Sequence, residues 1–465
     1  MNSSTIVETK AGKIQGYSEN GVKIFKGIPY AEPPIGDLRF RPSLPKAPWR
    51  DILDCTRFGP IAPQRTDAFL GSDPDSKQSE KDCLSLNVWT PATDDKRRPV
   101  LFWIHGGGFS FGSGSRQDGS HLARYNDVVV VTINYRVGIF GYLYVPGEIA
   151  NLGQLDQITA LTWVRDNIES FGGDPGNVTI FGESAGGVAV CTLMGMPGAN
   201  GLFKRVISQS GACHPLRHRP PSGKGTEVIL SELGLKDFNL KTLQEIPTDK
   251  IVAAARKLEL EARRKGTNFP YGVYVDEKTL PKHPLEAVRE GLAKDLDLMV
   301  GTNQDEAKLY TAMIPPEKET DEERLVQAIH RILRFRGKDE NDVKQIIAVY
   351  RKTRQGKLPT DPQDILDAFM TDFRFRISGL RLVEAQARHQ SNVFSYLFTY
   401  KTPAMGGKLG ACHGLEIPFV FGMLSGSARS VPVVGVEYPD TALFFRVYDE
   451  LRKFWPHTVQ ALDYG

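Results

Sequence analysis

The sequence predicts an α/β fold in which a central, mixed or mostly parallel β-sheet is flanked by helices. Continuous apolar runs at 100–105 and 127–135 suit strands that are covered on both faces. The segment 152–172 has apolar residues at helical spacing and ends at a glycine. A third apolar run, 177–181, leads directly into a small-residue stretch that favours a helix. Strands and helices therefore alternate along the chain, which indicates this fold class.

The other elements extend this pattern toward both ends of the chain. The first third of the sequence predicts short strands and loops, and further strands are expected at 205–211, 296–303 and 392–400. Between about 226 and 390 the pattern is mainly helical, which predicts insertions over one edge of the sheet. No repeat, low-complexity tract or clear linker divides the sequence, so residues 1–465 are predicted to form one domain.

The composition is that of an ordinary globular protein. Of the 465 residues, 40% are hydrophobic and 24% are charged, and the formal net charge is +3. Because both signs of charge are spread along the chain, no nucleic acid or anionic membrane is expected as a partner. No signal peptide is predicted at the N-terminus, and no apolar run approaches the roughly 18 residues that a membrane span needs.

The cysteines are few and widely scattered, so their spacing indicates neither a disulfide scaffold nor a metal site. A reducing cytoplasm is the predicted location. The five residues are Cys55, Cys83, Cys191, Cys213 and Cys412.

Two stretches match the GxSxG pattern of a nucleophilic serine, GFSFG at 108–112 and GESAG at 182–186. With 45 glycines in the chain, chance alone yields roughly 0.2 to 0.3 matches, so the pattern by itself decides little. The surrounding sequence is more informative, because a nucleophile elbow must join a strand directly to a helix.

The second stretch meets that requirement. The strand at 177–181 enters the turn without a break, and Gly182 and Gly186 stand two residues on either side of Ser184. Glycine is needed where the strand and the helix approach too closely for Cβ atoms. Ser184 is therefore the predicted nucleophile, and a glycine-rich turn with a capping serine is the alternative.

The first stretch fails the same test. Its strand ends at His105, glycines follow, and no helix begins directly after Ser110. A glycine-rich backbone can instead bring N–H groups close to a developing oxyanion, as the HGGG motif does in esterases and lipases. This predicts Gly107, Gly108 and Ala185 as the oxyanion-hole donors, with a flexible surface loop as the alternative.

A serine nucleophile needs an imidazole base that a carboxylate orients, and in this architecture both follow the serine along the chain. Four histidines follow the strand at 296–303. His330 and His389 belong to predicted amphipathic helices, and His457 lies close to the chain end. His413 lies in a glycine-rich loop after the last predicted strand. It is the predicted base, and a structural loop histidine is the alternative.

The candidate acids are neighbours. Asp305 and Glu306 lie just beyond the carboxyl end of the strand at 296–303, where open α/β sheets usually carry their sites. Either carboxylate could accept the imidazole N–H, so the chemistry leaves both open. An acid pair that stabilises a helix N-terminus is the alternative interpretation.

Several longer motifs are together highly specific: FKGIPYAEPPIGDLRFRP, DCLSLNVW, WIHGGGF, NYRVGIFGYL, GQLDQITALTWVRDNIESFGGDPGNVTIFGESAGG, GTNQDEA and CHGLEIPFVFG. On these motifs the chain resembles the type-B carboxylesterases of the carboxylesterase/cholinesterase family. It is most similar to the bacterial p-nitrobenzyl esterase branch, from the N-terminus to about residue 455.

The resemblance implies an α/β-hydrolase fold, helical insertions near an active-site gorge, and hydrolysis of carboxylic esters through an acyl-enzyme. It implies Ser184 as nucleophile, Glu306 as acid and His413 as base, together with the oxyanion hole named above. It also implies a small-molecule ester as substrate, no cofactor or metal, and a monomer or weak homo-oligomer. Three further positions match residues that support the histidine in the family: Glu183, Ser210 and Glu416.

The chain departs from the family pattern at two places. The family's N-terminal disulfide joins the cysteine of EDCL to one in a GPACPQ-like stretch. Here Cys83 takes the first position but Ala62 the second, so the bridge is not expected, and Cys55 is the alternative partner. The acid of EDCL is replaced by Lys81, through a substitution or an insertion after Glu80, which puts an ion pair near the gorge wall in question.

Other members of the superfamily fit less well. The neuroligin-like branch is non-catalytic and lacks the nucleophile, which this chain keeps. The hormone-sensitive-lipase-like esterases share HGGG and a similar elbow but lack the other long motifs. No tryptophan stands where cholinesterases carry their choline-binding ring.

Overall fold

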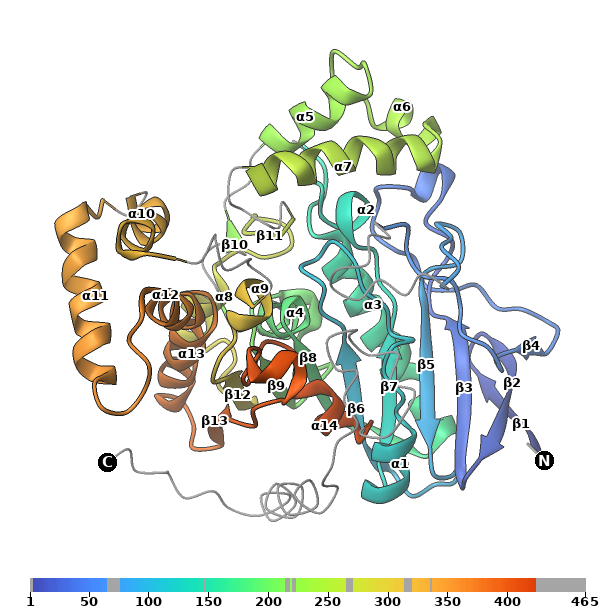
Figure 1. The fold of residues 1–465 in the computed structure, drawn as a ribbon. Coiled ribbons are helices and arrows are strands. Elements are labelled where there is room, and N and C mark those ends of the chain that lie inside the picture. Colours follow the sequence, from blue (N-terminus) through green and yellow to red (C-terminus); the bar gives the residue numbers. More distant parts are fainter. Residues whose placement is uncertain are drawn as a thin grey trace.

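The computed structural model describes residues 3–64, 76–145, 147–213, 218–219, 223–264, 271–312, 320–334 and 337–423. At its centre is a twisted sheet of eleven strands, in the order β1-β2-β3-β5-β7-β6-β8-β9-β12-β13, with β4 beside β2 (Figure 1). Neighbouring strands from β1 to β7 in this order are antiparallel, and those from β7 to β13 are parallel. The predicted mixed sheet is confirmed.

The strands of the main sheet are β1 (Ser3–Thr9), β2 (Gly12–Glu19), β3 (Val22–Pro29), β4 (Leu53–Asp54), β5 (Ser85–Thr90), β6 (Arg98–Ile104), β7 (Val129–Ile133), β8 (Gly173–Glu183), β9 (Arg205–Gln209), β12 (Asp297–Asn303) and β13 (Val393–Phe398). A separate parallel pair consists of β10 (His218–Arg219) and β11 (Val273–Tyr274).

The α-helices are α1 (Ser120–Asn126), α2 (Gly138–Tyr142), α3 (Leu152–Asn167), α4 (Ala185–Leu193), α5 (Lys224–Glu232), α6 (Leu240–Glu245), α7 (Thr248–Arg264), α8 (Pro284–Arg289), α9 (Lys308–Thr311), α10 (Glu322–Leu333), α11 (Glu340–Arg354), α12 (Pro362–Thr371), α13 (Ile377–Ala387) and α14 (Ile417–Phe421). In the part of the chain that the structure describes, no helix has both the length and the apolar character to cross a membrane.

The predicted central strands are present because their apolar runs are buried in the sheet, whereas β13, at the edge, is only partly buried. Every residue of β5 and β7 is buried, as two-sided apolar runs require. Strands β6, β8, β9, β12 and β13 all run in the same direction, so their carboxyl ends lie at one edge of the sheet. The loops after β6, β8, β12 and β13 carry the residues that the sequence singles out.

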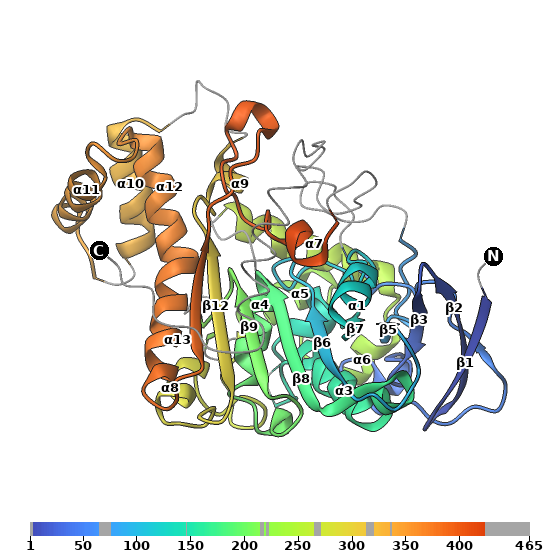
Figure 2. The same cartoon turned by 90° about the horizontal axis from the view of Figure 1, so that it is seen from below.

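The helical region between 226 and 390 gathers on two sides of the sheet. Figure 1 shows α5, α6 and α7 together above it, whereas α10 to α13 lie beside the β12–β13 edge, as Figure 2 also shows. Helices α10, α11 and α12 pack around an apolar cluster of their own. A π-helical turn at Asp372–Arg376 joins α12 to α13, a feature that the helical periodicity did not predict.

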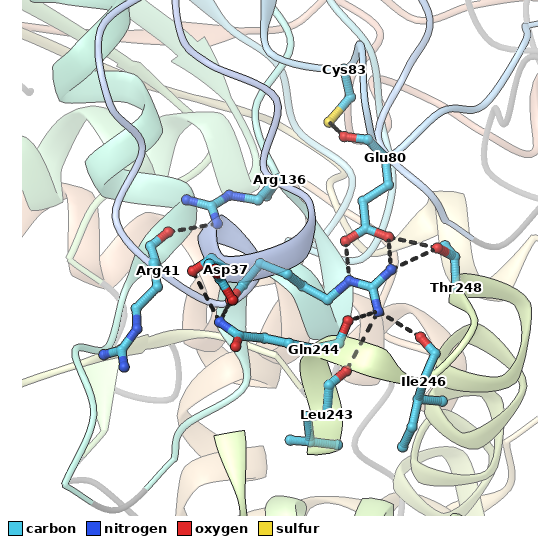
Figure 3. A network of polar contacts seen from close by, with 10 residues as sticks. Asp37, Arg41, Glu80, Cys83, Arg136, Leu243, Gln244, Ile246 and Thr248 are labelled. Atoms are coloured by element: carbon cyan, nitrogen blue, oxygen red, sulfur yellow. Dashed lines mark hydrogen bonds and ion pairs between the residues drawn. The ribbon is translucent and has the colours of Figure 1, made fainter. Parts of the chain in front are cut away.

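A buried ion pair ties α6 and α7 to the N-terminal part of the chain (Figure 3). Nε and Nη2 of Arg39 lie 2.5 and 2.7 Å from the two carboxylate oxygens of Glu80. Nη1 donates to the carbonyls of Gln244 and Ile246 at 3.0 and 2.5 Å, and Thr248 Oγ1 donates to Glu80 at 2.6 Å. One guanidinium therefore binds the carboxyl end of α6 and the start of α7.

This network answers the question that Lys81 raised. Lys81 is exposed, while Glu80, one residue earlier, supplies the carboxylate of the ion pair. The acid of this pair therefore stands one position before Lys81 in the chain. All five cysteines are free and buried, and the thiol of Cys83 donates to the Glu80 carbonyl at 3.3 Å.

Candidate active site

Ser184 occupies a sharp turn between β8 and α4. Its backbone has φ 57° and ψ −120°, a conformation that residues other than glycine rarely adopt. Its N–H donates to the Gln209 carbonyl at 2.9 Å, and its own carbonyl accepts from the N–H of Val188 at 2.9 Å. These bonds hold the strained turn, in which the serine begins a helix at the carboxyl edge of the sheet.

Glycines make this turn possible, because the backbone of β6 comes too close to it to leave room for a Cβ atom. A Cβ on Gly186 would lie 2.0 Å from the carbonyl oxygen of Ile104, the last residue of β6. A Cβ on Gly182 would lie 2.6 Å from that same oxygen. The spacing of the two glycines around Ser184 thus has the steric cause that the sequence suggested.

The glycine-rich loop after β6 runs beside the serine. A Cβ on Gly106 would lie 3.1 Å from Cβ of Ser184. Gly107 and Gly108 have φ values of 102° and 64°. Within the described part of the chain, the N–H groups of Gly107, Gly108 and Ala185 donate no backbone hydrogen bond in the loop or at the helix start. These three N–H groups therefore remain available as donors to a ligand.

Ser110 lies in the same loop but on no elbow. Its N–H donates to the Gly107 carbonyl at 3.0 Å, and the next helix begins only at Ser120. The residue is buried, and it joins no strand directly to a helix as an elbow serine does. The first GxSxG match, at 108–112, therefore lies in a loop, as the sequence predicts.

Glu306 and His413 meet although 107 positions separate them in the chain. Nδ1 of His413 lies 2.6 Å from Oε2 of Glu306, and both side chains are buried. The other carboxylate oxygen accepts from Ser210 Oγ at 2.5 Å and from the N–H of Asn303 at 2.7 Å. Each oxygen of the carboxylate therefore has a fixed partner, which orients the imidazole.

Asp305 faces a different set of partners. Its Oδ2 accepts from the N–H of Ala411 at 3.0 Å, and its Oδ1 lies 3.3 Å from Nζ of Lys308. Asp305 thus fastens the loop that carries His413, while its neighbour Glu306 contacts the imidazole itself. The contacts distinguish the two acids that sequence chemistry left open.

Asn303, which the sequence analysis did not single out, connects the buried acids. Its Nδ2 donates to the Cys412 carbonyl at 2.7 Å and to Glu416 Oε2 at 2.6 Å, while its N–H binds Glu306. Gln209 Nε2 donates to the other Glu416 oxygen at 3.3 Å. The position of Asn303 at the end of β12, beside the acid pair, is the signal that could have identified it.

Two aromatic rings pack on His413, and sequence reasoning missed both. The ring centroid of Phe375, from the π turn, is 4.6 Å from that of the imidazole. The ring of Tyr310, from α9, is 5.9 Å away. Both lie in helices whose periodicity gave no functional signal.

Burial favours the neutral form of two acids around the imidazole. It raises the pKa of Glu183 to about 8, with His413 acting in the opposite direction. It also raises the pKa of Glu416 to about 7. Burial alone lowers the pKa of His413, but Tyr310 and the carboxylates of Glu183 and Glu306 outweigh it, so this pKa lies well above its ordinary value.

The second nitrogen of the imidazole faces Glu183. Nε2 of His413 lies 3.1 Å from Oε1 of Glu183, but the two atoms do not have hydrogen-bond geometry. In the described part of the chain, no hydrogen bond joins His413 to Ser184.

The other candidate histidines lie elsewhere. His330 is half-buried in α10, and His389 is exposed just beyond the end of α13, with Nε2 3.1 Å from the Arg289 carbonyl. His457 lies outside the described residues. Among the residues that the structure describes, no cluster of His, Cys, Asp and Glu side chains suits a metal ion.

Comparisons with known proteins identify the family of the chain. The carboxylesterase family matches residues 3–449. The para-nitrobenzyl esterase of Bacillus subtilis (strain 168) is 38% identical over 430 residues, which cover 91% of this chain and 84% of that protein. The phenmedipham hydrolase of Pseudarthrobacter oxydans is 33% identical over 472 residues, which cover 100% of this chain and 91% of that protein.

Solved structures give the same result. The Geobacillus stearothermophilus carboxylesterase EST55 superposes with a TM-score of 0.79 at 39% identity, covering 94% of this chain and 87% of that one. A PNB esterase superposes with a TM-score of 0.81 at 34% identity, covering 97% and 90%. The fold is the α/β-hydrolase fold, and the resemblance to p-nitrobenzyl esterases is confirmed. The chain belongs to the carboxylesterase family and is a carboxylic ester hydrolase.

Proposed function

We propose that the chain hydrolyses esters through an acyl-enzyme on Ser184, with His413 as general base and Glu306 as the acid that orients it. The observation that carries this proposal is the 2.6 Å contact between His413 Nδ1 and Glu306 Oε2, beside a serine held in an elbow. A carboxylate on Nδ1 fixes the tautomer whose Nε2 is free to accept the serine proton.

The reaction begins when the imidazole turns from Glu183 toward Ser184. Such hydrogen bonds often tighten only when substrate is bound. Nε2 of His413 takes the hydroxyl proton while Oγ attacks the ester carbonyl, and the free N–H groups of Gly107, Gly108 and Ala185 receive the oxyanion. Collapse of the tetrahedral species transfers the proton to the alcohol and leaves the acyl-enzyme.

Deacylation uses the same groups in reverse order. Nε2 of His413 takes a proton from water, the resulting hydroxide attacks the acyl carbonyl, and the proton returns to Ser184 Oγ as the acid departs. Glu306 stabilises the imidazolium that forms in each half. The substrate is a small-molecule ester, and every step uses this chain's own residues. The monomeric or weakly associated state and the cytoplasmic location stay predictions from the sequence.

Paired substitutions test the assignment. Ser184→Ala is expected to lower kcat for a neutral aryl ester by about 10⁶-fold, because the nucleophile is lost. Ser110→Ala, the other GxSxG serine, serves as the matched control. His413→Ala is compared in the same way with His389→Ala. Full activity in Ser184→Ala, or loss of activity in His389→Ala but not in His413→Ala, would contradict the proposal.

A further inference from the structure

The π turn between α12 and α13 carries an arginine that contacts the same tyrosine ring as the candidate base. Phe375 of this turn packs on the imidazole of His413. The preceding residue, Arg374, holds its guanidinium carbon 5.7 Å from the centroid of the Tyr310 ring, and that ring is itself 5.9 Å from the imidazole. The arginine thus lies one aromatic ring away from the residue that we assign to proton transfer.

Arg374 has no counter-ion in the described part of the chain. No carboxylate there forms an ion pair or hydrogen bond with it, and its one described polar contact is the Tyr310 ring. The acid of its own turn is already engaged. Oδ1 of Asp372 receives Arg376 Nη1 at 2.6 Å, and Oδ2 receives the Tyr350 hydroxyl at 2.9 Å.

Arg376, the second arginine of the turn, has a structural role because its guanidinium is held by hydrogen bonds to neighbouring groups. Besides binding Asp372, Arg376 donates to the carbonyls of Asn303 and Gln304 at 3.3 and 3.2 Å. It therefore braces the loop that leads to Glu306. Arg374 makes no such bond, although it is partly buried.

Partial burial of an unpaired guanidinium is unfavourable. Burial lowers the pKa of Arg374 while Tyr310 opposes the change, as expected for a cation that lacks an acidic partner. The ring face of Tyr310 attracts the cation but does not occupy its in-plane N–H donors. A guanidinium offers these donors in a planar fork that matches a carboxylate.

We propose that Arg374 binds an anionic group of the substrate, so that the site favours esters that carry a free carboxylate in addition to the ester bond. The inference rests on the proposed function, because it needs His413 to be at the reaction centre. The carboxylate can belong to the acid half or to the alcohol half of the ester, and the experiment distinguishes the two.

Two matched substrate pairs test the proposal. Monoethyl adipate and ethyl adipamate differ only by a carboxylate or a neutral amide in the acid half. The pair 4-acetoxybenzoate and 4-acetoxybenzamide differs in the same way in the alcohol half. For each pair, the ratio of kcat/KM for the anionic ester to that for the neutral ester is measured in the wild type and in Arg374→Met.

We expect Arg374→Met to lower this ratio by about 10- to 100-fold for one of the pairs, as loss of a hydrogen bond to a charged group implies. Arg374→Lys keeps the positive charge but not the planar pair of N–H donors. Its ratio should therefore lie between that of the wild type and that of Arg374→Met. Arg381→Met, which removes an exposed arginine of α13, is the matched control and should leave the ratio unchanged.

The outcomes separate the two proposals. A ratio that Arg374→Met leaves unchanged for both pairs overturns the inference while ester hydrolysis stands. A wild type that hydrolyses both anionic esters more slowly than their amides overturns it too, even where a variant fails to fold. Hydrolysis of none of the four esters overturns the proposed function and the inference with it.

Discussion

His413 lies between two glutamates of different character. Glu306 binds its Nδ1 with a short hydrogen bond, whereas Glu183 lies near Nε2 without hydrogen-bond geometry. Negative charge on either carboxylate favours the imidazolium and so raises the pKa of His413. A general base must be neutral to accept a proton, so this environment places the acidic limb of the rate profile at a higher pH than for a free imidazole.

Glu183→Gln is expected to move that limb to lower pH. The change removes a group whose ionised form stabilises the imidazolium, which lowers the pKa of His413 and leaves the base neutral over a wider range. Because burial raises the pKa of Glu183 to about 8, the effect should be largest toward the upper end of the pH range, where Glu183 ionises. The measurement is kcat/KM for a neutral ester from pH 5 to 9. Glu384→Gln, an exposed acid of α13, is the control. A limb that stays in place or moves to higher pH would show that Glu183 does not act on the base.

For single residues of the site, the sequence predicts the features that depend only on neighbouring residues in the chain. The elbow around Ser184 could be recognised because the strand, the glycines and the helix are contiguous. The choice between Asp305 and Glu306 depends on which carboxylate faces a histidine more than a hundred positions away, and only the folded chain decides it. Asn303 and Phe375 were missed for the same reason.

Among the elements, the π turn marks the limit of helical periodicity. The segment that contains α12 and α13 has an amphipathic pattern, which predicted helix without a break. One extra residue in a turn shifts the phase of the apolar pattern too little to be recognised in the sequence. The π turn itself is stabilised by contacts from other elements, which the local sequence does not show. Here those contacts are the bonds of Arg376 to the Asn303 and Gln304 carbonyls, the bond of Asp372 to Tyr350, and the packing of Phe375 on the imidazole.

The buried Arg39–Glu80 ion pair joins α6 and α7 to the rest of the protein. Arg39→Met leaves the Glu80 carboxylate buried without its cation and frees two carbonyls at the end of α6. We expect the free energy of unfolding to fall by about 3 to 5 kcal/mol. Urea unfolding measures this change.

The control for that prediction is a neighbouring arginine on the surface. Arg41 pairs with Glu148 at 2.6 Å, and both side chains are partly exposed to solvent. Arg41→Met should therefore change the free energy of unfolding by about 0 to 1 kcal/mol. Equal effects of the two substitutions would contradict the structural role of the buried pair.

Over the whole molecule, the parallel part of the sheet determines where the site lies. Four strands separated in sequence end at one edge, and each leads into a loop with a candidate residue. The apolar runs predicted these strands, and the direction of their ends followed from the α/β pattern. The antiparallel pairing of β1 to β5 lacked such a signal. That the chain forms one domain stays a prediction.

The central claim is that this arrangement makes Ser184 the nucleophile of an ester hydrolase. An organophosphate that phosphylates activated serines tests it most directly, with the adduct located by peptide mass spectrometry. One adduct is expected, on Ser184; its extent should match the loss of activity, and it should be absent in His413→Ala. An adduct on Ser110, or inactivation without modification of Ser184, would contradict it.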